Sequence, residues 1–129
     1  MKIIIAGGRD FNDYPLMKQK CSEILKDLLP ACTNETENVE IISGGARGAD
    51  RLGETFAREH SFRLKVFKAD WDKLGKIAGF VRNEQMAVYA SQDNDLGVLI
   101  AFWDGKSEGT GNMVDLAFRY DLKVYVVNY

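Results

Sequence analysis

Apolar residues occur along the chain in two patterns, short continuous runs and repeats at helical spacing. Residues 2–6 form an Ile-rich run and residues 97–102 a fully apolar one. Continuous rather than alternating apolarity indicates strands that are buried on both faces, as in a parallel sheet. Further strands are expected over about 39–43, 64–67 and 123–127.

Repeats at helical spacing fill the segments between these strands. The first helix is expected over about 14–29, with Pro15 in its first turn and Pro30 at its end. Three more helices are expected, from a glycine-rich run to about 60, from about 80 to 91, and from an N-cap at Thr110 to about 120. Residues 68–79 are predicted to be a long loop, and 31–38 a polar loop.

Strands and helices therefore alternate from one end of the chain to the other. This alternation predicts one α/β domain over residues 1–129, a Rossmann-like three-layer α/β/α fold with about five parallel strands. Right-handed crossovers give an expected strand order of 3-2-1-4-5. Glycine-rich loops follow three of the strands, at 7–11, 43–50 and 103–111. Because the carboxyl ends of parallel strands share one edge, these loops are expected to converge where ligands bind in such folds.

The loop at 43–50 reads SGGARGAD and joins a strand to a helix. Glycines allow a backbone to approach a ligand closely, and the free N–H groups and dipole of a helix N-terminus favour an anion. Ser43 and Arg47 add side-chain donors, so we interpret the loop as a phosphate-binding site. The alternative is a tight turn that uses glycine for its geometry alone. Asp50 either contacts the ligand or compensates the helix dipole.

Several other side chains near the predicted edge could take part in chemistry. Arg9 lies in the first loop, and Asp10 beside it could hold Arg9, bind a ribose hydroxyl or form a turn. Arg82 could clamp a phosphate or carboxylate, or it could be a solvated surface residue. Trp71 and Trp103 follow strands, where each could stack on a base or pack in the protein. Asp104 and Glu108 are carboxylates that could act as acid or base.

Composition narrows the classes of function. The chain has 129 residues, 46% of them hydrophobic, and a formal net charge of −2, which argues against broad nucleic-acid binding. No apolar run is long enough to span a membrane, and no signal peptide is evident, so a cytoplasmic location is expected. Cys21 and Cys32 lack metal-ligand spacing; we predict no metal site and place Cys21 in the core.

Two familiar nucleotide motifs do not fit the sequence. Gly105-Lys106-Ser107 resembles the end of a Walker A loop, but the glycine required five positions earlier is Ile100, inside a strand. A dinucleotide-binding site needs its glycines after the first strand and an acidic residue at the end of the second, which here ends at Ser43. A P-loop NTPase is rejected and an NAD-dependent dehydrogenase is disfavoured.

Five sequence blocks together resemble the SLOG superfamily, in its YspA/YpsA-related branch of small stand-alone proteins. The blocks are IIIAGGRDF (3–11), SGGARGADRLGE (43–54), KADW (68–71), AGFVRNEQM (78–86) and AFWDGKSEGT (101–110). The resemblance implies a Rossmann-like fold and the binding of nucleotides or nucleotide-derived ligands.

The same superfamily includes the phosphoribohydrolases often labelled lysine decarboxylase-like, and the chain is similar to them in three places. Their phosphate loop corresponds to Gly44, Gly45 and Gly48, and their catalytic Arg-x-x-x-Met pattern to Arg82 and Met86. Their second loop has Gly-Thr followed closely by glutamates. Gly109 and Thr110 match, but residues 111–114 contain no glutamate, which puts that activity in doubt. Related enzymes dimerise, so a homodimer is a further expectation.

These observations favour one hypothesis and leave two alternatives open. The first is binding of a nucleotide or a derivative such as ADP-ribose, for sensing or processing in nucleotide-related signalling, with no other cofactor. Arg82 would clamp an anionic group. The expected ligand-binding residues are Gly7, Gly8, Arg9, Ser43, Gly44, Gly45, Ala46, Arg47, Gly48, Asp50, Gly109 and Thr110.

The two alternatives belong to other classes of protein. One is a hydrolase of N-glycosidic bonds, in which Asp10, Asp104 or Glu108 replaces the absent glutamate and Arg82 stabilises developing charge. The other is a DNA-associated binding module, against which the near-neutral charge counts.

Overall fold

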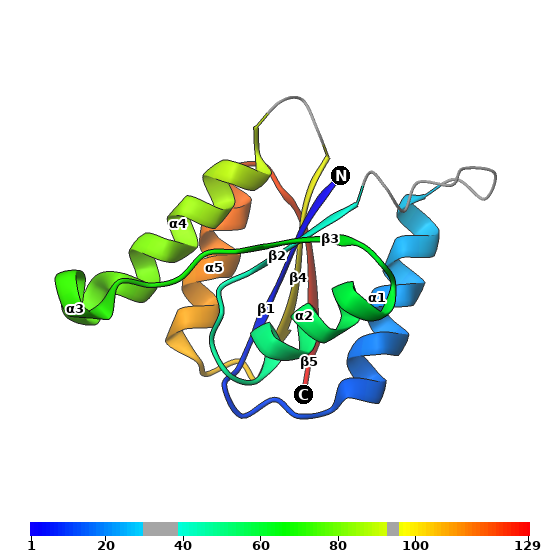
Figure 1. The fold of residues 1–129 in the computed structure, drawn as a ribbon, viewed down its shortest axis with the longest axis horizontal. Coiled ribbons are helices and arrows are strands. Elements are labelled where there is room, and N and C mark those ends of the chain that lie inside the picture. Colours follow the sequence, from blue (N-terminus) through cyan, green and yellow to red (C-terminus); the bar gives the residue numbers. More distant parts are fainter. Residues whose placement is uncertain (30–38, 93–95) are drawn as a thin grey trace.

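Five parallel strands form one sheet in the computed structural model, which describes residues 1–29, 39–92 and 96–129 (Figure 1). The order β3-β2-β1-β4-β5 confirms the predicted order and the Rossmann-like fold. The polar loop predicted at 31–38, with Cys32, lies outside the described residues. The strands are β1 (Lys2–Gly7), β2 (Glu40–Ser43), β3 (Arg63–Val66), β4 (Gly97–Trp103) and β5 (Lys123–Asn128).

The centre of the sheet is β1, which pairs with β2 on one side and β4 on the other. Ile3 is in register with Ile41 and with Val98, and all three side chains are fully buried. From β1 the chain builds outward through β2 to β3, and it then returns to add β4 and β5 on the opposite side. The strand order therefore reverses between β1 and β4, which is where ligands bind in open α/β sheets.

Two helices cover each face of the sheet, as Figure 1 shows. One core cluster joins Ile3, Ile5 and Phe102 to α1 (Tyr14–Leu28) and α2 (Ala49–Glu59), and contains the buried free thiol of Cys21. The other cluster joins Ile4 and Leu99 to α4 (Ala78–Ala90) and α5 (Glu108–Arg119). No helix within the described ranges has both the length and the apolar character needed to cross a bilayer.

The segment 68–79 is not a continuous loop, so that prediction was wrong. It contains the short helix α3 (Trp71–Leu74) and a 3₁₀ turn, η2 (Gly75–Ile77), and α4 already begins at Ala78. The carboxylate of Asp70 accepts a hydrogen bond from the Lys73 amide at 3.1 Å and so caps α3. This local cap stabilises a helical turn in a segment that was predicted to be a loop.

The N-cap of α5 also differs from the prediction. Ser107, not Thr110, holds the N-cap position, and Thr110 lies in the first turn of the helix. Asp104 accepts hydrogen bonds from the amides of Lys106 (2.8 Å) and Ser107 (2.9 Å), which closes a turn just before the cap. That turn makes the helix start three residues earlier than expected.

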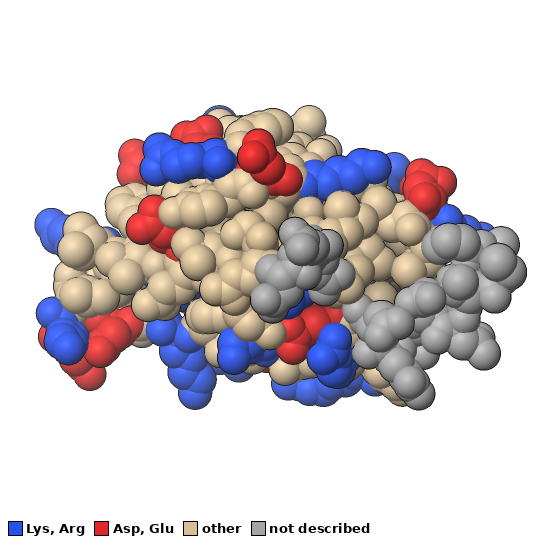
Figure 2. All heavy atoms as spheres, turned by 90° about the horizontal axis from the view of Figure 1, so that it is seen from above, with Lys and Arg blue, Asp and Glu red and all other residues tan. Residues whose placement is uncertain are grey.

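Charged residues of both signs are interspersed on the face at the amino ends of the strands, which Figure 2 shows from above. Lys and Arg side chains there have Asp and Glu side chains among them.

Candidate functional site

A cleft of about 740 Å³ opens at the carboxyl edge of the sheet, where the strand order reverses. Its wall combines residues from the three glycine-rich loops with residues of α3 and α4. A second lobe of about 610 Å³ adjoins it, and the two lobes share Arg9, Ala46, Arg47, Trp71 and Arg82. The volume suits a small-molecule ligand.

Most of the residues predicted from the sequence lie in the wall of this cleft. Gly44 and Gly45 line only the second lobe, whereas Ser43 and Gly48 lie behind the wall. The predicted residues that line the first lobe are Gly7, Gly8, Arg9, Asp10, Ala46, Arg47, Asp50, Arg82, Asp104, Glu108, Gly109 and Thr110.

Ser43 supports the loop from beneath. Its side chain is fully buried, and its hydroxyl donates to Glu54 Oε2 at 2.7 Å while accepting from the Gly45 amide at 3.1 Å. The hydroxyl proton is therefore engaged inside the protein. The Ala46 amide is engaged as well, because it donates to Asp50 Oδ2 at 3.1 Å. The Gly45 and Ala46 amides therefore both donate within the protein. Side chains, rather than these two amides, are available to contact a ligand.

The glycines of the 43–50 loop make room for other parts of the protein. Gly48 has a φ of +81°, and a Cβ there would lie 2.4 Å from the Gly8 carbonyl oxygen. The next amide, of Ala49, donates to that same oxygen at 3.2 Å. A Cβ at Gly44 would lie 2.8 Å from Asp50 Oδ2 and 2.9 Å from Arg82 Cζ. These positions need glycine for loop packing whether or not a ligand is bound.

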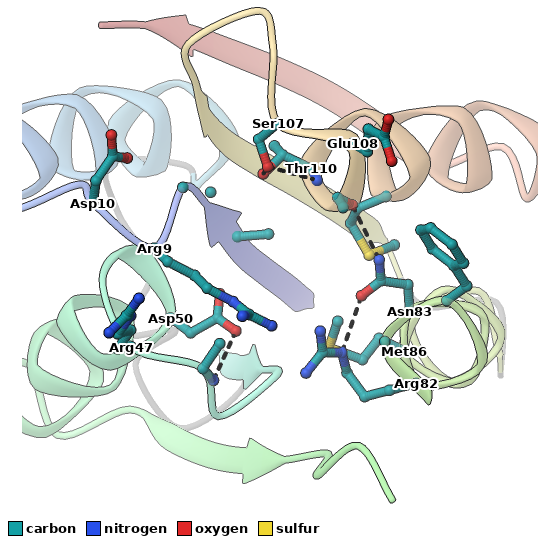
Figure 3. A pocket seen from close by; sticks show the side chains of 18 of the residues that line it. Arg9, Asp10, Arg47, Asp50, Arg82, Asn83, Met86, Ser107, Glu108 and Thr110 are labelled. Atoms are coloured by element: carbon teal, nitrogen blue, oxygen red, sulfur yellow. Dashed lines mark hydrogen bonds between the residues drawn. The ribbon is translucent and has the colours of Figure 1, made fainter. Parts of the chain in front are cut away.

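Three arginines from three separate elements converge on the cleft (Figure 3). Arg82 donates from Nη1 to the Gly44 carbonyl at 2.6 Å and from Nε to Asn83 Oδ1 at 3.0 Å. Within the described ranges, the guanidinium groups of Arg9 and Arg47 form neither a hydrogen bond nor an ion pair; Arg9 lies 5.7 Å from the centre of the Trp71 ring. Arg82 is thus partly structural, whereas Arg9 and Arg47 keep their donors free.

Asp50 is a buried carboxylate in the cleft wall, only 6% exposed. Burial raises its pKa to about 6, although the Ala46 amide and the positive charges of Arg82 and Arg9 act in the opposite direction. Burial also lowers the pKa of Arg82, which the charge of Asp50 counteracts. The opposite charges of Asp50 and Arg82 therefore partly offset the cost of burying each group.

Asn83 is a buried polar residue of the site that the sequence did not reveal. It is 4% exposed, and besides accepting from Arg82 it donates from Nδ2 to the Gly109 carbonyl at 3.1 Å and to Asn112 Oδ1 at 3.0 Å. It thereby connects α4 to the first turn of α5. The polar run Arg82-Asn83-Glu84-Gln85 has the pattern of a solvated surface, so no sequence signal marked this position.

The carboxylates proposed to replace the absent glutamate have different surroundings. Asp10 accepts a hydrogen bond from the Tyr129 hydroxyl at 2.6 Å. Asp104 is occupied by the amides of Lys106 and Ser107, which hold its pKa below the usual range. Glu108 lies in the wall at the start of α5. No group of three His, Cys, Asp or Glu side chains suited to a metal occurs among residues 1–29, 39–92 and 96–129.

Comparison with known proteins places the chain in a family. The model of the YspA, cpYpsA-related SLOG family (YAcAr) matches residues 1–74. The chain belongs to this family. It is also 40% identical over 114 residues to the Gene 61 protein of Mycobacterium phage D29, an alignment that covers 84% of this chain and 82% of that protein. No solved structure matches it.

The match to the SLOG family covers the elements from β1 through α3 and therefore the first two cleft loops. Arg82, Asn83 and the loop after β4 follow the matched segment. Their place in the cleft comes from the three-dimensional arrangement, which brings α4 and α5 against the loops that the family match includes.

Proposed function

We propose that this SLOG protein binds a nucleotide or a nucleotide-derived ligand in the cleft, as a sensor or processing domain in nucleotide-related signalling. One observation carries the proposal: Arg9 and Arg47 line the switch-point cleft beside Arg82, and their guanidinium groups have no hydrogen-bond or ion-pair partner among the described residues. The planar guanidinium group of an arginine carries paired N–H donors, and a phosphate can accept two hydrogen bonds from them at once. Membership of the SLOG family is consistent with such a ligand.

The charges of the cleft support an anionic ligand. The first lobe is lined by as many carboxylates as cationic side chains, with Asp50 the buried one, but the described lining of the second lobe contains no carboxylate and five cationic side chains: Arg9, Arg47, Arg51, Lys68 and Arg82. An anion held by Arg9 and Arg47 would reduce the repulsion between these cations at little cost, since neither has to give up a partner in the described structure. The 43–50 loop then contributes mainly through the Arg47 side chain.

Thermal unfolding against a panel of ligands tests the proposal. The panel comprises AMP, GMP, ATP, GTP, NAD, ADP-ribose and ribose 5-phosphate. A ligand present at 100 times its Kd adds about 2.7 kcal/mol to the free energy of unfolding, which is a shift of several degrees for a domain of this size. We expect at least one nucleotide to give that shift, and Arg9→Ala and Arg47→Ala to reduce it.

Arg63→Ala is the matched control, because Arg63 is an exposed arginine at the first residue of β3, at the opposite edge of the sheet. It should leave the shift unchanged. Absence of any shift with every ligand of the panel at millimolar concentration would contradict the proposal. Equal losses in Arg63→Ala and Arg47→Ala would contradict the assignment of the phosphate to the cleft.

Hydrolysis of an N-glycosidic bond is a second candidate function, and the surroundings of Asp50 favour it. A buried carboxyl with a pKa near 6 that faces the cleft can take a proton from a water whose oxygen bonds to the anomeric carbon of the sugar. The base leaves with the electrons of the broken bond and is protonated by solvent. Chromatography of AMP and GMP incubated with the protein would detect the free base. Asp50→Asn should abolish its release, and intact nucleotides after prolonged incubation with the wild type would exclude the activity.

A further inference from the structure

The three arginines explain how the protein would bind the phosphate of the ligand, but they do not indicate what the rest of the ligand is. We propose that Trp71 is the platform on which the nucleobase of the ligand stacks. The ligand is then an aromatic base joined to a phosphate, and not a phosphorylated sugar alone. This inference rests on the proposed function and defines its ligand more closely.

The position of Trp71 suits this role. It is the first residue of α3 and lies in the wall of both lobes of the cleft. The Asp70 cap fixes the start of that helix, and the ring lies against the start of α4, where a Cβ at Gly79 would be 3.3 Å from Trp71 Cη2. The indole is therefore held at the boundary between the two lobes.

Trp71 also leaves about half of its side chain exposed. Its side chain is 48% exposed, belongs to neither core cluster, and its indole N–H has no hydrogen-bond partner in the part of the chain that the structure describes. Trp103 provides the contrast, because its Nε1 donates to the Ser107 carbonyl at 3.0 Å and its ring packs against Gly111. Packing explains Trp103 and leaves the exposure of Trp71 unexplained.

The charges beside Trp71 fit a nucleotide. Arg9 lies 5.7 Å from the centre of its ring, within the range of a cation–π contact, and Arg47 and Arg82 line the same two lobes. One molecule can thus place its phosphate on the arginines and its base on the indole. Phe80, 43% exposed in the wall of the first lobe, adds further apolar surface. Every nucleobase has a π-face, so this platform favours bases as a class.

Calorimetric titration with AMP and with ribose 5-phosphate tests the inference. Stacking on one aromatic side chain changes affinity by about tenfold or more. Trp71→Ala should weaken AMP binding by that factor and change ribose 5-phosphate binding by less than about twofold. Trp71→Phe keeps an aromatic face and should retain most of the AMP affinity. Because the ring is half exposed, both variants should unfold at close to the wild-type temperature.

Fluorescence gives an independent measurement. A base stacked on Trp71 should quench the emission of the wild-type protein, and the quenching by AMP should disappear in Trp71→Phe, where packed Trp103 is the remaining tryptophan.

Three results would overturn the inference while leaving nucleotide binding intact: unchanged AMP affinity in Trp71→Ala, equal losses for AMP and ribose 5-phosphate, or ribose 5-phosphate binding as tightly as AMP. Failure of every ligand of the thermal-unfolding panel to bind the wild-type protein would instead overturn the proposed function, and the inference with it.

Discussion

At the scale of single residues, Asp50 is a cleft carboxyl whose surroundings change its acidity. Its carboxyl is buried on the cleft wall, and its pKa is raised from 3.8 to about 6. The folded protein therefore holds the proton of Asp50 more tightly than the unfolded chain does. The resulting stability is fully present below about pH 4 and is lost as the pH rises through about 6.

This shift predicts a difference in the pH profiles of the wild type and Asp50→Asn. The free energy of unfolding of the wild type should fall relative to that of the variant by about 2 kcal/mol between pH 4 and pH 8. Asn keeps an oxygen that can accept from the Ala46 amide but does not titrate. Urea unfolding of both proteins across this range is the measurement, and parallel profiles would show that Asp50 titrates normally.

Gly48 and Gly105 form a natural pair for testing how tightly the cleft loops pack. Both have a φ of +81°, but a Cβ at Gly48 would meet the backbone of Gly8 and Arg9, whereas nothing lies within 4 Å of one at Gly105. Alanine at either position bears the strain of a positive φ. We expect Gly48→Ala to lower the free energy of unfolding by about 1–3 kcal/mol more than Gly105→Ala does, because its methyl group would overpack the loop. Equal free energies of unfolding would show that the first two loops are not in contact.

At the scale of elements, the cleft depends on how α4 and α5 are joined. Asn83 of α4 contacts the Gly109 carbonyl and the Asn112 side chain of α5, and it also accepts from Arg82, which reaches the Gly44 carbonyl after β2. A chain of hydrogen bonds therefore runs from the loop after β2 to the loop after β4. It sets the relative position of two of the three loops that form the cleft.

Substitution at this junction should affect stability in a graded way. Asn83→Ala removes three hydrogen bonds in a buried setting and should lower the free energy of unfolding by about 2–3 kcal/mol. Asn112→Ala removes one of them and should cost about 1 kcal/mol. Denaturant unfolding distinguishes the two. A loss in Asn112→Ala as large as in Asn83→Ala would mean that the contact with Gly109 contributes little.

For the molecule as a whole, the sequence predicted the sheet order and the convergence of the loops because both follow from alternation and chain direction. It failed where one side chain decides the local outcome, as at the Asp70 cap of α3 and at Ser107, which begins α5 in place of Thr110. It also missed the buried contacts of Asn83 and Ser43. Those depend on which segments meet in space, and no spacing along the chain reports that.

The contact between Asp10 and Tyr129 has a consequence for handling the protein. The Tyr129 hydroxyl reaches so close to the first loop that a Cβ at Gly8 would lie 1.9 Å from it. The C-terminus therefore lies at the cleft edge, whereas the N-terminus lies at the opposite edge of the sheet (Figure 1). An affinity tag or surface attachment placed after Tyr129 would crowd the cleft. One placed before Met1 would leave the cleft open to solution and would orient the molecules of a biosensor chip with their arginines outward.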